Sequence, residues 1–379
     1  MARALSKIRS CCCRRSSGQS LELDAPAAAT GAQQQAAAAA RRKPQTRTKK
    51  TWLLSAALLN KRPKTDDSAE QQQQTAATTA TRAKARRASS CTSQDESISS
   101  QKCNRLDFSH QKLCDIPNLI FSLENKSQLE ELCVESNCIQ EITRNLFAHC
   151  KQLKRLQLSD NDIQTIPSQI GQLTQLEHLQ AARNQISDVP DEIKRCRKLI
   201  SLDLSVNPIG KVCDGLTSLA KLRELYLNDI FLDFLPASIG RLTELRVLEM
   251  RENDLKTLPK SMARLTELRC LDLGQNDLLY VPEVLGNISS LEELWLDQNQ
   301  IQHLPDFLGK LSQLEYFDVG KNNISQVDVL FFRCCNLRDL ILSSNCLQHL
   351  PSTLCDLNKL NSLKLDDNEM SDLPADLGK

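Results

Sequence analysis

The chain has 379 residues, of which 40% are hydrophobic and only 4% aromatic, with a formal net charge of +1. So few aromatic residues argue against an ordinary globular core but suit a stack of leucine-rich layers. The small net charge hides an asymmetry, because residues 1–100 hold 18 Lys and Arg against 7 Asp and Glu. The remainder is acidic, which argues against nucleic acid as its ligand.

Residues 1–20 contain no acidic side chain and have three consecutive cysteines, Cys11, Cys12 and Cys13, followed by Arg14 and Arg15. Thiols next to a basic cluster favour S-palmitoylation, in which acyl chains insert while the arginines hold an anionic membrane surface. Stable anchoring needs two such signals. Two alternatives remain open: a basic tail with unmodified thiols, and a mitochondrial transit peptide, which also favours Arg and Ser.

Residues 21–100 are of low complexity, with runs of Ala and Gln that bury too little apolar surface to offset the entropy of ordering. We therefore predict a disordered basic tail over residues 1–102. The apolar segment Trp52–Leu59 is too short to span a bilayer. It is expected to form a brief helix on a membrane or a partner, or only a transient helix in the tail.

Two short basic motifs follow in the tail. The segment Lys61–Lys64, KRPK, resembles a nuclear import signal. Ser89 follows Arg86 and Arg87 and is a phosphorylation candidate. A phosphate there would lower the positive charge of the tail and weaken its attraction to a membrane.

The strongest signal is a repeated pattern, clearest in Leu291–Pro305, LEELWLDQNQIQHLP. The alternation around Trp295 predicts a short strand with one buried face. Asn299 falls where the chain must turn, and its amide can bond main-chain groups that would otherwise be buried without a partner. Pro305 ends the unit because it has no N–H. This is the signature of a leucine-rich repeat.

The repeat is regular, and its first Leu recurs every 23 residues, at Leu153, Leu176, Leu199, Leu222, Leu245, Leu268, Leu291, Leu314, Leu337 and Leu360. A 24-residue unit starts at Leu129, and a degenerate unit begins near Cys103. The turn Asn recurs in phase, at Asn137, Asn161, Asn184, Asn207, Asn253, Asn276, Asn299, Asn322, Asn345 and Asn368.

These spacings predict one repeat solenoid over residues 103–379, an α/β horseshoe of about twelve repeats with the last one incomplete. Parallel strands are expected on the concave face and short helical turns on the convex face. Ile230 stands in place of one turn Asn, so we expect a local distortion at Asp229–Phe231. The chain stops in mid-coil, which leaves open a fragment of a longer protein or a frayed last coil.

The 16 cysteines form no Cys-x-x-Cys pair, and no secretory signal is visible, which together favour a reducing cytosol. Cys150, Cys196 and Cys334 occupy a slot where other coils have Leu, so they are expected to be small buried hydrophobes. The glycosylation sequons at Asn125 and Asn287, and a third at Asn323, are then coincidental.

The third, fifth, seventh and eighth positions of each unit should face the concave side. The central column, at the fifth position, reads Cys133, Gln157, Gln180, Asp203, Tyr226, Glu249, Asp272, Trp295, Asp318, Ile341 and Lys364. Exposed aromatic residues among charged groups are typical of protein-recognition surfaces, and the acidity favours a basic segment of the partner. The candidate partner-binding residues are Asp203, Tyr226, Asp229, Glu249, Arg251, Glu252, Asp272, Trp295, Asp297, Tyr316 and Asp318. The plainer interpretation is a solvated polar face on which Trp295 packs along its strand column.

An enzyme is not expected. The five His have no ligand spacing for a metal, no nucleophile elbow or phosphate-binding glycine loop appears, and neither a cofactor nor a small-molecule substrate is predicted.

Three stretches resemble the LAP family, the Scribble, Erbin and Densin group: LNDIFLDFLPASIGRLTELRVLEMREN, LDLGQNDL and LEELWLDQNQIQHLPDFLGKL. That family also lacks the turn Asn in its Leu-Asn-Asp coil, as at Ile230, and begins its repeats after Cys-Asn-Arg, as at Cys103–Arg105. Two departures are the hundred residues before this motif and the lack of PDZ domains in this sequence.

The resemblance implies a scaffold on the cytoplasmic side of the basolateral plasma membrane or a cell junction, which organises cell polarity through protein contacts. It also makes Cys103 a lipidation candidate. Two alternatives remain: a regulatory scaffold of Ras-type GTPase or phosphatase signalling, and a nuclear adaptor.

Overall fold

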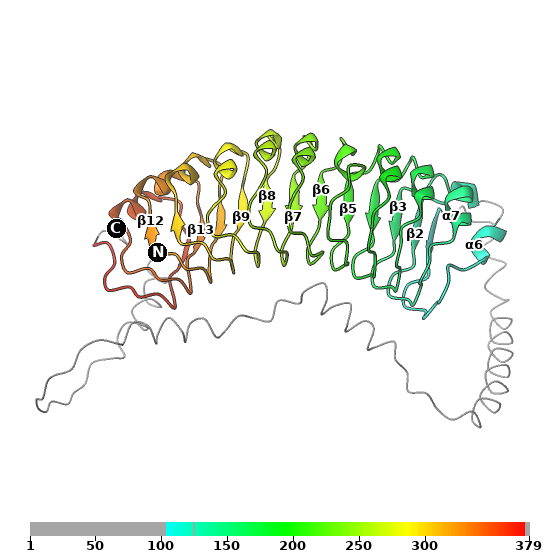
Figure 1. The fold of residues 1–379 in the computed structure, drawn as a ribbon, viewed down its shortest axis with the longest axis horizontal. Helices are drawn as coiled ribbons and strands as arrows, with labels where there is room; N and C mark the ends of the chain where they lie inside the picture. Colours follow the sequence, from blue (N-terminus) through cyan, green and yellow to red (C-terminus); the bar gives the residue numbers. More distant parts are fainter. Residues whose placement is uncertain (1–103, 124–125, 376–379) are drawn as a thin grey trace, which may run out of the picture. The chain divides into compact units, whose positions relative to one another are not determined.

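The computed structural model describes residues 104–123 and 126–375. Their main feature is one parallel sheet of twelve strands, joined in the order of the chain (Figure 1). Each strand has three residues, and the strands are β1 (Arg105–Asp107), β2 (Glu131–Cys133), β3 (Arg155–Gln157), β4 (His178–Gln180), β5 (Ser201–Asp203), β6 (Glu224–Tyr226), β7 (Val247–Glu249), β8 (Cys270–Asp272), β9 (Glu293–Trp295), β11 (Tyr316–Asp318), β13 (Asp339–Ile341) and β14 (Ser362–Lys364). The leucine-rich repeat solenoid expected from the period is therefore confirmed.

The register follows the repeat. Leu294, in the middle of β9, pairs with Leu271 on one side and Phe317 on the other, and all three side chains are buried. A strand of three residues thus buries its middle side chain and presents the first and third on the inner side of the sheet.

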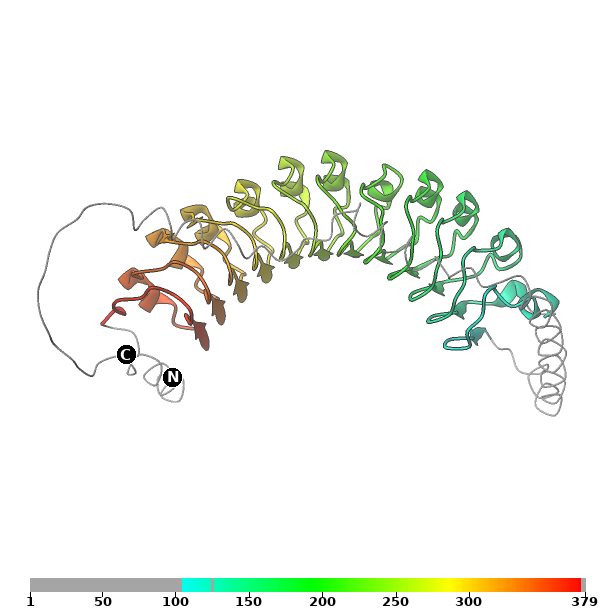
Figure 2. The same ribbon diagram turned by 60° about the horizontal axis from the view of Figure 1, so that its bottom comes forward.

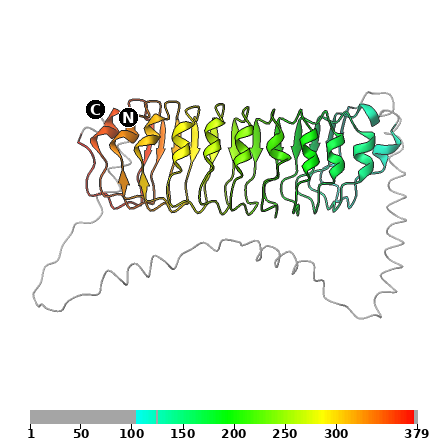
Figure 3. The ribbon, with the colours of Figure 1, turned by 45° about the horizontal axis from the view of Figure 1, so that its top comes forward.

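The return arms form 3-10 helical turns on the outer side of the arc, while the strands line the inner side (Figure 2). Seen from another side, the turns follow one another along the stack in the order of the chain (Figure 3). A proline in the repeat motif precedes most of these turns; Pro305, for example, is the N-cap of Asp306–Lys310. The turns are η2 (Lys126–Gln128), η3 (Ser168–Gln172), η4 (Asp191–Arg195), η5 (Leu216–Ser218), η6 (Ala237–Arg241), η7 (Lys260–Arg264), η8 (Glu283–Asn287), η9 (Asp306–Lys310), η10 (Val329–Arg333) and η11 (Ser352–Asp356).

Two short α-helices and a second sheet depart from this plan. The first two coils have α6 (Leu119–Ser122), which precedes η2, and α7 (Arg144–His149). A second, two-stranded parallel sheet pairs β10 (His303–Leu304) with β12 (Gln326–Val327) on the return arms. Two-residue strands carry too little pattern to be predicted from sequence.

The turn asparagines form a ladder of side-chain hydrogen bonds. In a typical coil the Asn276 amide donates to the carbonyls of Met250, Leu273 and Gly274, at 2.9, 3.0 and 3.1 Å. Its oxygen accepts the N–H of Leu255 at 3.1 Å. One buried amide thus satisfies main-chain groups of its own turn and of the preceding coil.

The distortion expected at Ile230 is present. Asp229 has the positive φ that each coil shows at its turn, and Phe231 adds a second one at 59°. Ile230 is fully buried, and its carbonyl accepts the N–H of Gly210 at 2.7 Å. A main-chain hydrogen bond therefore connects two coils at the position where the side-chain amide of an Asn would otherwise do so.

The core is continuous along the stack and consists mainly of Leu and Ile. Cys150, Cys196 and Cys334 are fully buried, as predicted, and the Sγ–H groups of Cys196 and Cys334 point at main-chain carbonyls 3.3 and 3.1 Å away. In the last described coil Leu360 and Leu363 are only partly buried, whereas their counterparts in inner coils are sealed.

Candidate protein-binding surface

The fifth-position side chains form one continuous column across the inner side of the sheet. Strand pairing places Asp203 beside Tyr226, and the same register repeats through each following strand pair. We call the central part of this column the acidic strip, which comprises Asp203, Tyr226, Glu249, Asp272, Trp295 and Asp318. The structure thus brings together the residues that the repeat period aligned.

The aromatic side chains of this region are less exposed than the sequence suggested. Tyr226, Trp295 and Tyr316 are all half-buried, because neighbouring strands about 4.8 Å apart cover the flanks of each ring. The prediction that these rings are exposed is therefore only partly correct, because each ring is half-buried. The rings are nevertheless not sealed, so part of each ring remains accessible to solvent.

Burial disfavours the charged form of the carboxyls in the strip. It raises the pKa of the Asp272 and Asp318 carboxyls, although a main-chain N–H donated to each of them acts in the opposite direction. Burial also raises the pKa of Tyr226 to about 12, and the neighbouring charges of Glu224 and Glu249 contribute. Burial is therefore the main cause of these shifts, and an approaching cation would favour the charged form of each carboxyl.

Arg251 is the main cation of this region, and it is already engaged. Its guanidinium makes a two-bond contact with Asp297, at 2.9 and 2.6 Å, and reaches Asp272 at 3.4 Å and Gln275 at 3.1 Å. Asp297 lies two coils further on, so the side chain passes over Gly274 in the intervening coil. A Cβ atom at Gly274 would lie 2.2 Å from the Arg251 Nη1 atom.

The network extends to the preceding coil. Asn228 donates to Glu249 at 2.8 Å and accepts the main-chain N–H of Arg251 at 2.8 Å. The side chain of Asn228 therefore links two coils next to Ile230, where the turn Asn is missing. Sequence reasoning missed this role, and the only signal was an Asn two positions before Ile230.

Two candidates lie at the edge of the surface. Asp229 and Glu252 occupy the eighth position, which has a positive φ of 50° and 58° and belongs to the turn after the strand. Asp229 is half-buried and Glu252 is exposed. They border the acidic strip at the carboxyl ends of the strands and are not part of the sheet.

Trp295 and Tyr316 form an aromatic pair across neighbouring strands. Their ring centroids are 5.0 Å apart and the rings are tilted by 39°. Such packing is the plainer interpretation considered from the sequence, and here it coexists with partial exposure. The pair places two ring systems side by side on the inner surface.

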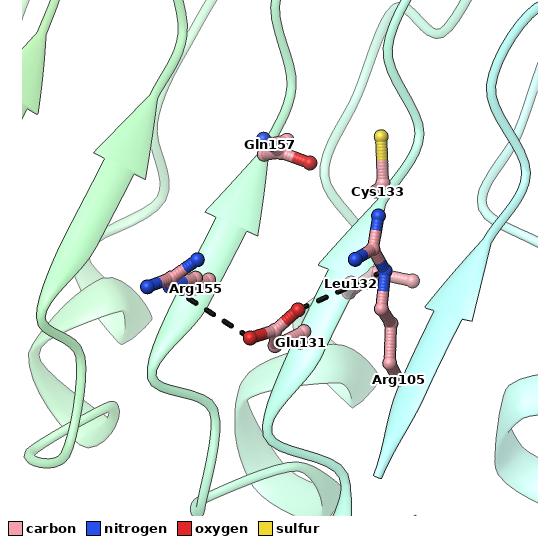
Figure 4. A pocket seen from close by; sticks show the side chains of 6 residues that line it. All are labelled: Arg105, Glu131, Leu132, Cys133, Arg155 and Gln157. Carbon is pink, nitrogen blue, oxygen red and sulfur yellow. Dashed lines mark ion pairs between the residues drawn. The ribbon is translucent and has the colours of Figure 1, made fainter. Parts of the chain in front are cut away.

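The amino-terminal end of the sheet differs in charge from the middle. A shallow pocket there is lined by Arg105, Glu131, Leu132, Cys133, Arg155 and Gln157 (Figure 4). Glu131 lies 3.7 Å from each of the two arginine side chains, and Asp107 is a further 3.8 Å contact of Arg105. The charges balance, so this end carries no excess of either sign.

A Ser and an Asp of the last described coil meet a His of the coil before it, but the three do not form a catalytic relay. Nδ1 of His349 lies 2.8 Å from Asp372 and 3.2 Å from Ser371, so both contact the same ring nitrogen. A relay needs the acid and the nucleophile on opposite nitrogens. All three side chains are exposed.

Over residues 104–123 and 126–375, no group of three or more His, Cys, Asp or Glu is arranged to hold a metal ion. Within the same ranges, no helix has the length and apolar character that a bilayer crossing requires. The lipidation candidates Cys11, Cys12, Cys13 and Cys103, the phosphorylation candidate Ser89, and the tail motifs at Trp52–Leu59 and Lys61–Lys64 lie outside the described residues.

Comparison with known families supports the repeat assignment. Residues 210–326 match the leucine-rich repeat region family, and residues 127–186 and 314–370 match the leucine rich repeat family. These matches contain no catalytic family. The matched repeats are of the kind that present extended concave surfaces for binding.

Among curated proteins, the chain is similar to leucine-rich repeat-containing protein 7 of rat and of human, with 47% identity over 68 residues. The match covers 18% of this chain and only 4% of either relative.

Two solved structures show the same fold. One is the leucine-rich repeat protein LIC12759 of Leptospira interrogans, with 32% identity, a TM-score of 0.68 and coverage of 70% of this chain and 67% of that one. The other is the ectodomain of the Arabidopsis receptor kinase HAESA in complex with an IDA peptide hormone. It has 30% identity, a TM-score of 0.59 and coverage of 69% and 46%.

Proposed function

We propose that this chain is a non-enzymatic scaffold that binds a basic segment of a partner protein on the acidic strip. The observation that carries the proposal is the unbroken register from Asp203 to Asp318, which aligns acids and aromatic rings on one inner surface. The carboxylates of the strip are complementary in charge to a basic segment, and the half-buried rings supply apolar contact area.

The comparisons support the general part of this proposal. The HAESA ectodomain, which shares 30% identity and this fold, is described in complex with a peptide hormone. A peptide or protein segment is therefore a ligand class that a related solenoid accepts. A concave surface of parallel strands suits an elongated ligand better than a compact one.

We further propose that the scaffold is of the LAP kind and acts at the cytoplasmic side of the plasma membrane, in polarity or junction complexes. The support is the short stretch of 47% identity to leucine-rich repeat-containing protein 7 and the sequence motifs around Cys103 and Ile230. Anchoring through Cys11, Cys12 and Cys13 belongs to the same proposal.

The binding proposal is tested by affinity capture with the full chain and with a Trp295→Ala/Glu249→Lys variant. We expect the variant to lose the specifically captured proteins while it still unfolds in one cooperative transition. A matched control is Tyr280→Ala/Glu283→Lys, which makes the same kinds of change at exposed residues outside the strip. Equal capture by both double variants would reject the strip as the binding surface.

The localisation proposal is tested by imaging a Cys11/Cys12/Cys13→Ser variant. We expect the membrane signal to disappear. Unchanged membrane signal would reject the amino-terminal anchor, and nuclear accumulation would favour the nuclear adaptor instead.

A further inference from the structure

The aromatic pair of Trp295 and Tyr316 has the properties of a cation-binding surface. The two rings lie on neighbouring strands, β9 and β11, with centroids 5.0 Å apart, and both are only half-buried. The face of an aromatic ring attracts a cation within about 6 Å of its centroid, with Trp the strongest. Two adjacent rings offer such a surface to a single group.

Carboxylates surround this pair on the same side of the sheet. Strand register places Tyr316 between Glu293 and Asp339, and it places Asp318 directly beside Trp295. Paired positions on parallel strands are about 4.8 Å apart, so all three carboxylates are within reach of a group on the rings. Burial raises the pKa of the Tyr316 hydroxyl, and the charges of Asp318 and Asp339 raise it further.

The basic side chains of Arg251 and Lys364 act to lower the pKa of Asp318, but they offset only part of this negative charge. Arg251 is held by Asp297 through two hydrogen bonds, so its charge is already compensated. Lys364 lies on β14, two strands beyond Asp318. The Asp318 carboxylate is itself fixed in position, because it accepts the main-chain N–H of Gly320 at 2.8 Å.

We propose that Trp295, Tyr316 and Asp318, flanked by Glu293 and Asp339, form a subsite for a guanidinium group. Its ligand is an arginine side chain of the bound protein segment, so the inference rests on the proposed binding function. A planar guanidinium stacks on an aromatic face and donates two parallel hydrogen bonds to a carboxylate, which an ammonium does not do. The subsite therefore selects arginine over lysine.

The test uses the full chain labelled with 5-fluorotryptophan. The sequence has two Trp, Trp52 and Trp295, so a Trp295→Phe variant assigns the resonances. The probes are N-acetyl-arginine amide, N-acetyl-lysine amide and N-acetyl-citrulline amide, of which the last is a neutral isostere of the first. We expect the Trp295 resonance to shift saturably with the arginine probe, about fivefold more weakly with lysine, and not with citrulline.

A pair of variants separates the subsite from general electrostatics. Asp318→Asn is expected to weaken the arginine probe at least about fivefold. Glu267→Gln removes the same charge from an exposed pair with Arg246, away from the strip, and is expected to leave binding unchanged. Equal shifts with citrulline, equal affinity for lysine, or equal effects of the two variants would each overturn the guanidinium assignment.

The result is separable from that of the capture experiment. The probe titration reports on Trp295 alone. A Glu249→Lys single variant, which keeps Trp295, is added to the capture experiment, and its loss of capture reports on the strip outside the subsite. Saturable arginine binding with unchanged capture would contradict the proposed function and leave the subsite standing. Loss of capture without arginine selectivity would contradict the subsite and leave the proposed function standing.

Discussion

At the scale of single residues, the turn asparagines hold the coils together. Each buried amide replaces main-chain partners that a three-residue strand and a tight turn cannot supply. An unpaired buried polar group costs about 1–3 kcal/mol, so the ladder stabilises the stack mainly by preventing that cost.

Asn276→Ala is expected to lower the free energy of unfolding by about 2–4 kcal/mol, because three main-chain carbonyls and one N–H lose their partner. Urea unfolding measures the change. Asn287→Ala, at an exposed position on the convex side, serves as the control and should change the free energy by less than about 0.5 kcal/mol. Similar midpoints for the two variants would contradict the role of the ladder.

A second residue-scale prediction concerns Gly274. A methyl group there would displace the far end of the Arg251 side chain from Asp297. Since that end can move, Gly274→Ala should destabilise the chain by only about 0.5–1 kcal/mol, the size of the lost ion pair. Gly320→Ala is the matched change at the equivalent position two coils on, where the nearest atom would be 3.1 Å away. Thermal unfolding should show the smaller loss for Gly320→Ala, and an equal loss would refute the steric argument.

At the scale of elements, each strand is stabilised by the return arm behind it. In the coil of β11, the Phe317 ring packs on Phe331 of η10 at 5.6 Å, and Phe331 in turn contacts Phe332 at 5.0 Å. All three rings are buried. This coil therefore links the inner and outer sides through aromatic packing, where most coils use Leu and Ile.

Phe317→Ala is expected to cost about 3–5 kcal/mol, since it removes a fully buried ring and leaves a cavity between β11 and η10. Phe234→Ala removes the same group from a position that is 59% exposed, and it should cost less than about 0.5 kcal/mol. Denaturant unfolding of both variants checks the difference. A loss at Phe234 as large as that at Phe317 would contradict this packing.

The elements also show what the sequence could and could not predict. Strands, turns and register followed from the Leu and Asn spacing, because a fixed period leaves one way to stack the coils. The aromatic column was aligned correctly, but the half-burial of Trp295 was missed because it depends on how neighbouring strands cover a ring. The reach of Arg251 across Gly274 could not be predicted either, since a 46-residue separation carries no local pattern.

At the scale of the whole molecule, the charge of the acidic strip opposes folding at neutral pH. Burial raises the pKa of Glu249 above 4.5, although the hydrogen bond from Asn228 acts against it. Asp272 and Asp318 are raised above 3.8. A carboxyl whose pKa is higher in the folded chain binds more protons there than in the unfolded chain. The free energy of unfolding therefore falls as the pH rises from the pKa of the carboxyl in the unfolded chain to its higher pKa in the folded chain.

Glu249→Gln is accordingly expected to raise the unfolding midpoint at pH 7 and to have less effect near pH 4, where the carboxyl is largely protonated in both states. Midpoints measured across this range check the sign. Glu267→Gln, which removes an exposed ion pair with Arg246, should give no gain. A lower midpoint for Glu249→Gln at pH 7 would contradict the conclusion that burial raises the pKa of Glu249.

The break in the ladder at Ile230 divides the stack into two blocks. Asn137 to Asn207 join the coils on one side and Asn253 to Asn368 those on the other, whereas a main-chain bond from Gly210 crosses the junction. Coils in such a stack contact only their neighbours, so partial opening starts at the weakest junction. Under tension or mild heating, we therefore expect the hydrogen bonds between the coils of Leu204 and Leu227 to break before the coils within either block unfold.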